Sequence, residues 1–512
     1  MKLLKENKFM NKDNILKYLI TILFILLPFL DMLRTTFIKD IELFNISIIE
    51  LVNIILIGGS LLITVIKIFK TRKKDVFALI LFICAIIVYI ILHYKNIIKF
   101  DTTIFSKANF NFITETFYIG RVYILPLLLL FVLIENKKIF NKEFYFRISK
   151  IVIAIISFSI LFLNVFKISY ISYSATHDFV SNNMFDYFLY NGDFKLLASR
   201  GWFDSANELS AVLLLLLPFN IIMLYKEKKK FNIVLLVSQI LAMIILGTRV
   251  AAFGACAVCA FSIVCYVMIK LIKKESVNCS FVETFGLIIM ACTAYLSISP
   301  TMIARISDGF YDFSVKSEEA YEDLEKLDEI DDPKQLDELF QKYSDEYKVN
   351  PEFLKLYPID NDLEFWTSIF KRDKALNNNS RILKTDIIKR IEQRNNNEID
   401  KYLGIGYTLN FMDIERDYVY QYYLFGIVGI VLLILPYIIL LLINGGKALF
   451  NFNSNFNFKT LLAFMSPALI LVVAYLSGHV FGWVSPMLFL SMTLGMLTVT
   501  VSDNNKKKGN IK

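Results

Sequence analysis

Three ionisable side chains lie at the boundary between a long charged segment and an apolar run. Glu415, Arg416 and Asp417 are followed directly by residues apolar enough to enter a membrane. Charged groups at the mouth of a membrane helix cost free energy unless they pair or face water, so they are functional candidates by default. A carboxylate there could act as a general base, and a guanidinium could hold a phosphate group. We therefore take Glu415 and Asp417 as the candidate catalytic pair and Arg416 as a candidate phosphate ligand.

The segment before this cluster changes the sign of its charge. Residues 318–346 are rich in Asp and Glu, with apolar residues at helical spacing, which is typical of a solvated amphipathic helix without chemistry of its own. The part from Ser380 onward carries Arg381, Lys384 and Arg390. A basic half next to the membrane is expected if it covers an anionic substrate, and Arg381 is our candidate ligand there.

A second group of candidates lies in the sequence RGWFDSANE, which begins at Arg200. Ser205 and Glu208 have the spacing of a capping box, and helix capping would account for both of them. Capping does not explain Arg200 or Asn207, and an arginine beside a helix N-terminus could hold a phosphate group. Trp202 ends a loop rich in aromatic and amide side chains, which favours either stacking on sugars or anchoring at the membrane surface.

Three further positions carry charged or titratable side chains in apolar surroundings. Arg249 follows a tight Leu-Gly-Thr turn between two apolar runs, where it could reach any anionic lipid or clamp a pyrophosphate through its planar fork. His479 lies at another tight turn, where it could pack and cap or contact the substrate. Glu50 and Arg121 are predicted to pair with each other inside the membrane, in preference to a direct role in substrate binding.

Membrane helices must position these residues. Of the 512 residues, 56% are hydrophobic and only 20% are charged, which excludes an ordinary soluble domain of this size. About 20 helical residues cross the hydrocarbon core, and a helix satisfies its own backbone groups in lipid. The sequence therefore predicts an all-α polytopic membrane protein with about twelve transmembrane helices. The expected spans are 14–31, 44–66, 76–94, 117–135, 150–168, 206–225, 231–247, 250–270, 281–299, 417–443, 460–477 and 480–501.

Lysine and arginine are concentrated at both termini and in alternate loops between these spans. The basic loops lie near residues 67–74, 137–150, 226–230 and 270–274. By the positive-inside rule these loops and both termini are cytoplasmic. The net charge of +8 mostly reflects this bias. No basic-aromatic patch suggests nucleic acid as a partner, and we expect a multi-pass protein of the cell membrane.

One large insertion interrupts the spans on the side opposite to the basic loops. The sequence thus predicts three regions: helices one to nine in 1–299, a helical extracytoplasmic loop domain in 300–416, and the last three helices with a cytoplasmic tail in 417–512. The insertion places Arg381 and Glu415 outside the cell.

The order of the candidate residues resembles that of O-antigen ligase and O-antigen polymerase-like proteins. The motifs are the Arg200–Pro218 segment, the Leu246–Ala252 segment, Arg381, the Gly404-Ile405-Gly406 turn and the run from Glu415 to Gly429. They are short and scattered over residues 200–500. The resemblance implies a membrane glycosyltransferase of the GT-C kind, which moves a glycan from an undecaprenyl-pyrophosphate carrier to an acceptor. It implies neither a nucleotide sugar nor an obligate metal or other cofactor.

The resemblance also implies roles for particular residues. The family's arginines hold the pyrophosphate, which carries over to Arg249, Arg200 and Arg381. We expect Glu415 to deprotonate the acceptor hydroxyl, with Asp417 orienting it, and direct displacement to invert the anomeric centre. Asn207, Trp202 and His479 are the expected glycan contacts, and no residues are assigned to a metal.

One departure from the family pattern bears on the acceptor. Ligases that act on lipid A carry a His-Asn pair just before the helix that follows the large loop, whereas this chain has Glu415 there. The departure favours a polymerase of surface polysaccharide, such as O-antigen or capsule. The alternative is a ligase that moves the finished glycan onto a cell-wall or lipid acceptor.

A flippase or transporter of lipid-linked oligosaccharide is the rival from another class. Carriers place charges and broken helices near mid-membrane, whereas the charges here cluster outside, and transport has no obvious use for the large insertion. As partners we expect the lipid-linked oligosaccharide donor and membrane lipids, together with a flippase and a chain-length regulator.

Overall fold

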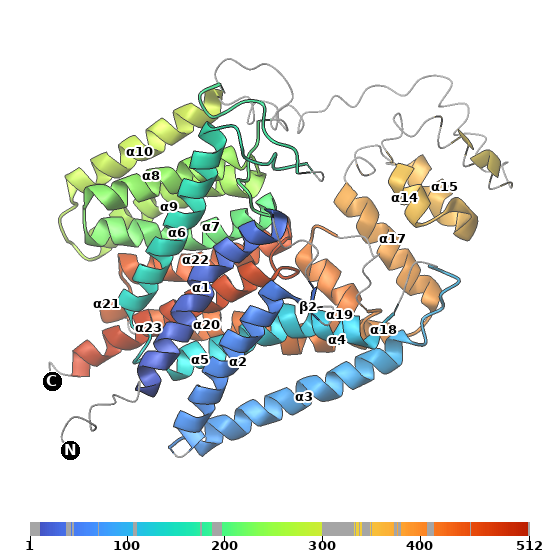
Figure 1. The fold of residues 1–512 in the computed structure, drawn as a ribbon, viewed down its shortest axis with the longest axis horizontal. Helices are drawn as coiled ribbons and strands as arrows, with labels where there is room; N and C mark the ends of the chain where they lie inside the picture. The colour runs from blue at the N-terminus through green and yellow to red at the C-terminus, as the bar shows by residue number, and fades with distance from the viewer. Residues whose placement is uncertain are drawn as a thin grey trace. The chain divides into compact units, whose positions relative to one another are not determined.

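The computed structural model is built from helices that follow the apolar runs of the sequence (Figure 1). It describes residues 11–36, 46–69, 71–105, 110–174, 177–186, 197–298, 351–372, 380–406, 414–450 and 452–509, together with isolated residues between these ranges. Most of the acidic segment 318–346 lies outside the described residues. One short hairpin pairs β1 (Glu42–Leu43) antiparallel with β2 (Ile46–Ser47).

The helices are named in chain order. The first group is α1 (Lys12–Thr36), α2 (Ile48–Phe69), α3 (Lys73–Ile97), α4 (Phe112–Ile119), the π-helix η1 (Gly120–Ile124), α5 (Leu125–Glu135), α6 (Lys142–Val165), α7 (Ala206–Lys226), α8 (Lys230–Ile245), α9 (Arg249–Ile272) and α10 (Cys279–Ile298). The second group is α14 (Pro351–Leu356), the 3-10 helix η5 (Ile359–Asn361), α15 (Leu363–Lys371), α17 (Ser380–Asn395), α18 (Asp400–Leu403), α19 (Asp417–Leu433), α20 (Leu435–Phe450), α21 (Phe452–Asn455), α22 (Phe458–Leu476) and α23 (Val484–Gly509).

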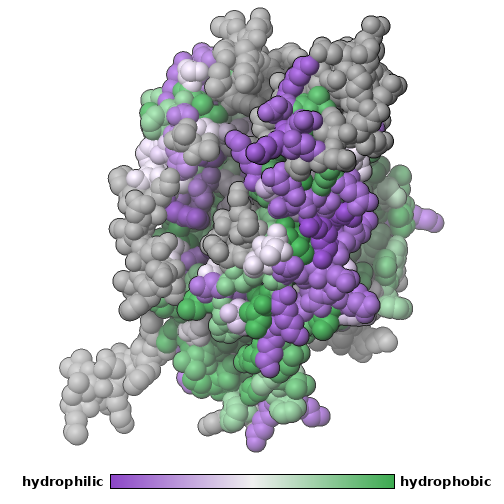
Figure 2. Space-filling model, turned by 90° about the vertical axis from the view of Figure 1, so that its right-hand side faces the viewer, coloured by the Kyte–Doolittle hydropathy of each residue, from purple (hydrophilic) through white to green (hydrophobic). Residues whose placement is uncertain are grey.

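Ten helical stretches in the described part of the chain are long and apolar enough to cross a membrane, and α8 and α10 contribute two shorter apolar stretches. The prediction of an all-α polytopic membrane protein is confirmed. The number of twelve spans stays a prediction. On the face drawn in Figure 2, hydrophilic side chains are concentrated over the centre right and hydrophobic ones toward the bottom and the right edge.

The chain forms two compact units. Unit 1 comprises Met1–Ile83, Ile119–Gly309 and Leu433–Lys512, and unit 2 comprises Cys84–Tyr118 and Phe310–Leu432.

Helix α7 is the centre of unit 1. In the most apolar stretches of α7 and α23, 94% and 89% of the residues are buried, against at most 56% in the other candidate spans. Five of the described helices cover α7, because it packs against α6, α8, α9, α22 and α23. Helices α8, α9 and α10 lie side by side, and α6 crosses them in contact with α8 (Figure 1).

The expected pair inside the membrane is present in unit 1. Arg121 lies in the π-helix η1, and its Nη1 donates to Oε1 of Glu50 on α2. The prediction that these two side chains pair with each other is therefore confirmed. Burying one of these charges alone would be far more costly than burying the pair.

The helices α14, α15 and α17 of unit 2 are joined through one carboxylate. Asp362 caps the N-terminus of α15 by accepting from Phe365 N (3.2 Å), and it also accepts from Arg390 of α17 (2.7 and 3.0 Å) and from the Tyr357 hydroxyl (2.9 Å). Burial opposes ionisation of Asp362, but these donors outweigh it and hold its pKa below the usual range. Burial is also the main cause that raises the pKa of Tyr357 to about 12.

Candidate functional site

The predicted base and one of the predicted phosphate ligands are each other's partners. Arg381 lies in the first turn of α17, and its Nε and Nη2 both donate to Oε2 of Glu415, at 2.8 and 2.7 Å. The two side chains are about one third exposed, at 30% and 33%. A charge-assisted pair of this kind fixes the direction of the carboxylate, and the partial exposure leaves it open to a substrate.

The other two members of the charged cluster lie at the start of α19. Asp417 is the first residue of this helix and is 4% exposed. A negative charge there is favoured by the helix dipole. Arg416 is half-buried, and its backbone N–H donates to Ile414 O (2.6 Å). Residues 407–413, which precede the cluster, lie outside the described residues.

A break in α19 receives the Gly-Ile-Gly turn of the sequence. The helix is interrupted at Gly426, where φ is 66° and ψ is −177°. The N–H of Ile405 donates to Tyr423 O (2.8 Å). The N–H of Gly406 donates to Leu424 O (3.0 Å). The turn therefore satisfies carbonyls that the break leaves without their helical partners, as buried backbone in a membrane requires.

Only glycine fits at the two points where these backbones cross. A Cβ on Gly404 would overlap the backbone carbonyl of Leu424, and a Cβ on Gly426 would overlap the backbone of Tyr402. Both glycines also have positive φ, at 81° and 66°, a conformation that glycine adopts without steric cost. This close crossing fixes the end of α18 against the first half of α19, which carries Asp417.

A buried histidine that sequence analysis missed holds the same crossing. His93 is completely buried, with Nδ1 2.6 Å from Leu403 O and Nε2 2.7 Å from Oε1 of Glu115. Because a carbonyl can only accept, Nδ1 donates to Leu403 O, and Nε2 is left facing the Glu115 carboxylate. The Tyr89 hydroxyl donates to Phe425 O at 2.8 Å, directly before the break.

The turn also rests on a buried carboxylate that the sequence did not single out. Asp400 is 2% exposed and accepts from the amides of Asn96 (2.7 Å), Asn395 (2.6 Å) and Asn397 (2.9 Å). Asn96 also donates to Gly404 O (3.0 Å). Burial raises the pKa of Asp400 despite the three amides. A histidine and an asparagine within one apolar run were the signal that could have pointed to this network.

Arg200 lies in unit 1, where it holds a loop together. Its Nη1 and Nη2 donate to the carbonyls of Ser172 (3.3 Å) and Ser174 (3.1 Å), and its backbone N–H donates to Tyr170 O (3.0 Å). The side chain is 6% exposed, and Nε has no partner among the described residues. Burial lowers the pKa of the guanidinium. The predicted role as a phosphate ligand stays a prediction.

Arg249 is exposed at the N-terminus of α9 and makes no ion pair within the described ranges. Thr248 caps the helix by accepting from Ala251 N (3.1 Å). The loop that Arg200 holds is attached to this turn, because Ser199 N donates to Ile245 O (2.9 Å) and the Tyr173 hydroxyl donates to Gly247 O (3.3 Å). The predicted ligands Arg200 and Arg249 thus belong to one connected set of loops.

The capping prediction at α7 is right for one residue and wrong for the other. Ser205 caps the helix by accepting from Glu208 N (3.4 Å). The Glu208 carboxylate does not return the bond, because it accepts from Ser485 of α23 instead. With Asp31 of α1 it lines a cavity of about 20 Å³, room for about one water molecule.

The three predicted glycan contacts are also in unit 1. Trp202 Nε1 donates to Ile168 O (2.7 Å), which ties the ring to the start of the loop between α6 and α7. Asn207 is half-buried in the first turn of α7. His479 follows α22 in a turn, with φ at 63°, and is partly buried. No contact with a glycan is tested for any of them, so these roles stay predictions.

The candidate residues are divided between the units. Arg200, Arg249, Asn207, Trp202 and His479 belong to unit 1, whereas Arg381, Glu415, Arg416 and Asp417 belong to unit 2. The family model described as "O-antigen ligase like membrane protein" matches residues 12–504, nearly the whole chain. The comparisons with curated proteins and with solved structures give no match.

Proposed function

We propose that this chain, which belongs to the O-antigen ligase-like family of membrane proteins, polymerises a surface polysaccharide. It transfers a glycan from a lipid-linked pyrophosphate donor to an acceptor sugar. The family supports a membrane enzyme that processes polysaccharide. The observation that carries the finer proposal is the Arg381–Glu415 pair, in which a guanidinium aligns a carboxylate that is one third exposed, next to a buried acid at the start of a membrane helix.

The reaction requires a base and a means to hold the leaving group. Glu415 takes the proton of the acceptor hydroxyl while the hydroxyl oxygen forms a bond to the anomeric carbon of the donor. The bond from that carbon to the pyrophosphate oxygen breaks, and the lipid pyrophosphate leaves with the electron pair. Direct displacement inverts the anomeric centre. General-base catalysis typically contributes about 10²–10⁴-fold to such a rate.

The arginines take different parts in this proposal. Arg249, exposed at a helix N-terminus, neutralises the pyrophosphate, since cations aimed at developing charge stabilise the transition state. Arg381 was predicted as a pyrophosphate ligand, and its bonds to Glu415 support a role in orienting the base instead. Glu415 in place of a His-Asn pair supports a polymerase over a ligase acting on lipid A.

The broken helix α19 favours one other function, transport of the lipid-linked glycan. Discontinuous helices form the binding sites of many carriers. Here, however, the carbonyls before the break accept from the Gly-Ile-Gly turn and from Tyr89. The break is thus filled by the protein's own groups, which supports a structural role for it.

Purified protein in closed lipid vesicles, supplied with lipid-linked oligosaccharide, distinguishes the two functions. A polymerase yields longer lipid-linked chains and releases one polyprenyl pyrophosphate for each bond formed. A flippase moves the donor between leaflets and releases none. Movement without release would overturn the proposal.

A further inference from the structure

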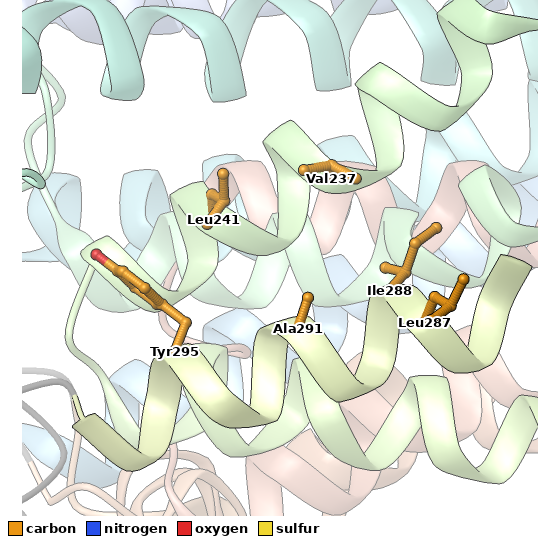
Figure 3. A pocket seen from close by; sticks show the side chains of 6 residues that line it. All are labelled: Val237, Leu241, Leu287, Ile288, Ala291 and Tyr295. Atoms are coloured by element: carbon orange, nitrogen blue, oxygen red, sulfur yellow. The ribbon is translucent and has the colours of Figure 1, made fainter.

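An open groove of about 390 Å³ runs along unit 1 between α8 and α10 (Figure 3). Its lining is Val237 and Leu241 of α8 and Leu287, Ile288, Ala291 and Tyr295 of α10. All of these are apolar except for the Tyr295 hydroxyl, which lies at one end (Figure 3). Its volume falls within the range of small-molecule sites, and its lining suits hydrocarbon.

The two ends of the groove differ in their distance along the chain from Arg249. Val237 lies near Leu287 and Ile288, and Leu241 lies nearer Tyr295 (Figure 3). Helix α8 runs toward the turn that ends in Thr248, so the Leu241 end of the groove is the end nearest to Arg249. Leu241 is four residues, or about 6 Å of helix, from the last residue of α8.

The length of the groove matches one leaflet. The stretch of α10 from Leu287 to Tyr295 rises about 12 Å, and half of the hydrocarbon core is about 15 Å. A groove of this length spans most of one leaflet, and the positive-inside rule predicts that its Arg249 end faces outside. From this end of α8 the chain turns into Arg249, whose side chain is exposed and makes no ion pair with any described residue.

We propose that this groove holds the hydrocarbon chain of the lipid-linked donor, with the phosphate next to the chain bound by Arg249. The inference rests on the proposed function for the identity of the lipid. An apolar groove within the bilayer excludes a polar occupant. The guanidinium of Arg249 favours a lipid whose head carries a phosphate. Neutral lipids satisfy the first condition but not the second.

Photolabelling tests the location of the chain without relying on catalysis. The purified protein in vesicles is labelled with a polyprenyl pyrophosphate that carries a diazirine in its chain, and the adducts are mapped by mass spectrometry. We expect adducts on residues 237–241 and 287–295, and competition by unlabelled polyprenyl pyrophosphate. Adducts elsewhere, or a diazirine phospholipid that labels equally well and is not displaced by polyprenyl pyrophosphate, would overturn the inference.

Filling the groove tests its part in turnover. Ala291→Phe places a ring in the groove, whereas Ala294→Phe adds the same ring to an exposed position of α10 that does not line it. We expect Ala291→Phe to raise KM for a long-chain donor about tenfold. KM for a short-chain prenyl donor should not change, and Ala294→Phe should leave both values as they are.

The two assays separate failure of the groove from failure of the proposed function. Ala291→Phe acting equally on long-chain and short-chain donors would contradict the groove while the enzyme remains a transferase. A wild-type protein that transfers from neither donor would contradict the proposed function, and photolabelling would still report whether the groove takes a polyprenyl chain.

Discussion

At the scale of single residues, two nitrogens of Arg381 donate to one oxygen of Glu415 and so hold the proposed base in one direction. Lysine has no planar fork and can offer that oxygen a single nitrogen. We expect Arg381→Lys to lower kcat about tenfold and Arg381→Ala to lower it further, because a misdirected base affects only the chemical step. Steady-state kinetics with purified protein measures both values.

The KM for the donor tells orientation from phosphate binding at this position. If Arg381 orients Glu415, KM stays near the wild-type value, whereas loss of a phosphate ligand raises it. Lys389→Ala removes an exposed cation from the same helix and serves as the control. A large rise in KM for Arg381→Ala with unchanged kcat would contradict the orienting role.

Asp362 gives unit 2 a dependence on pH. Because its pKa in the folded protein lies below the ordinary value, the ionised form stabilises the fold at neutral pH, and this stabilisation is lost as pH falls through the folded-state pKa, below about 4. We expect Asp362→Asn to cost about 1–3 kcal/mol at pH 7 and the difference from wild type to shrink in acid. Unfolding followed by fluorescence of the fully buried Trp366 measures the effect. Asp360→Asn, at an exposed position, should change nothing, and an equal loss for Asp362→Asn at all pH values would contradict the assignment.

At the scale of elements, the crossing of the Gly-Ile-Gly turn with α19 is the part that tolerates least change. The sequence marks Gly404 and Gly406 as a turn, but nothing in their neighbours tells which backbone the turn meets. In the sequence, Gly426 resembles any glycine in an apolar run, and only the nearby backbone of Tyr402, with which an added Cβ would clash, shows that glycine is required there. Local sequence therefore predicts the turn and the helix, and only the fold reveals their crossing.

Alanine at the crossing should damage the protein severely. We expect Gly404→Ala and Gly426→Ala to lower the melting temperature sharply or to abolish folding, because backbone atoms cannot move aside for a Cβ. Gly446→Ala, in α20, is the matched control, since the nearest atom to a Cβ there is Cε2 of Phe450, at 4.0 Å, an ordinary contact distance. It should be neutral or slightly stabilising. Equal melting temperatures for all three variants in detergent would contradict the crossing.

At the scale of the whole molecule, apolar runs of about 20 residues predict the class of fold because the bilayer sets that length. The partners within the buried polar networks, in contrast, cannot be predicted from the sequence. His93 and Leu403 are separated by 310 residues and Asn96 and Asp400 by 304, and neither pair leaves a periodic pattern in the sequence. The same is true of Glu208, whose spacing suggests a cap although its carboxylate bonds to Ser485.

The orientation of the chain is a prediction from the distribution of lysine and arginine, and it can be tested directly. In a cysteine-free background, Asp360→Cys should react with a membrane-impermeant maleimide added to intact cells, and Lys228→Cys only after the cells are opened. Both positions are exposed. The reverse pattern would place both termini outside and would contradict the assignment of the large loop to the outer side.

Replacing Glu415 tests the central claim most directly. With lipid-linked oligosaccharide as donor, we expect Glu415→Gln to lower the rate of polyprenyl-pyrophosphate release at least about a hundredfold. This factor is the lower end of the rate enhancement that general-base catalysis provides. Glu398→Gln, the same change at an exposed position of unit 2, should keep the wild-type rate. A correctly folded Glu415→Gln protein that releases polyprenyl pyrophosphate and extends the glycan at the wild-type rate would contradict the account.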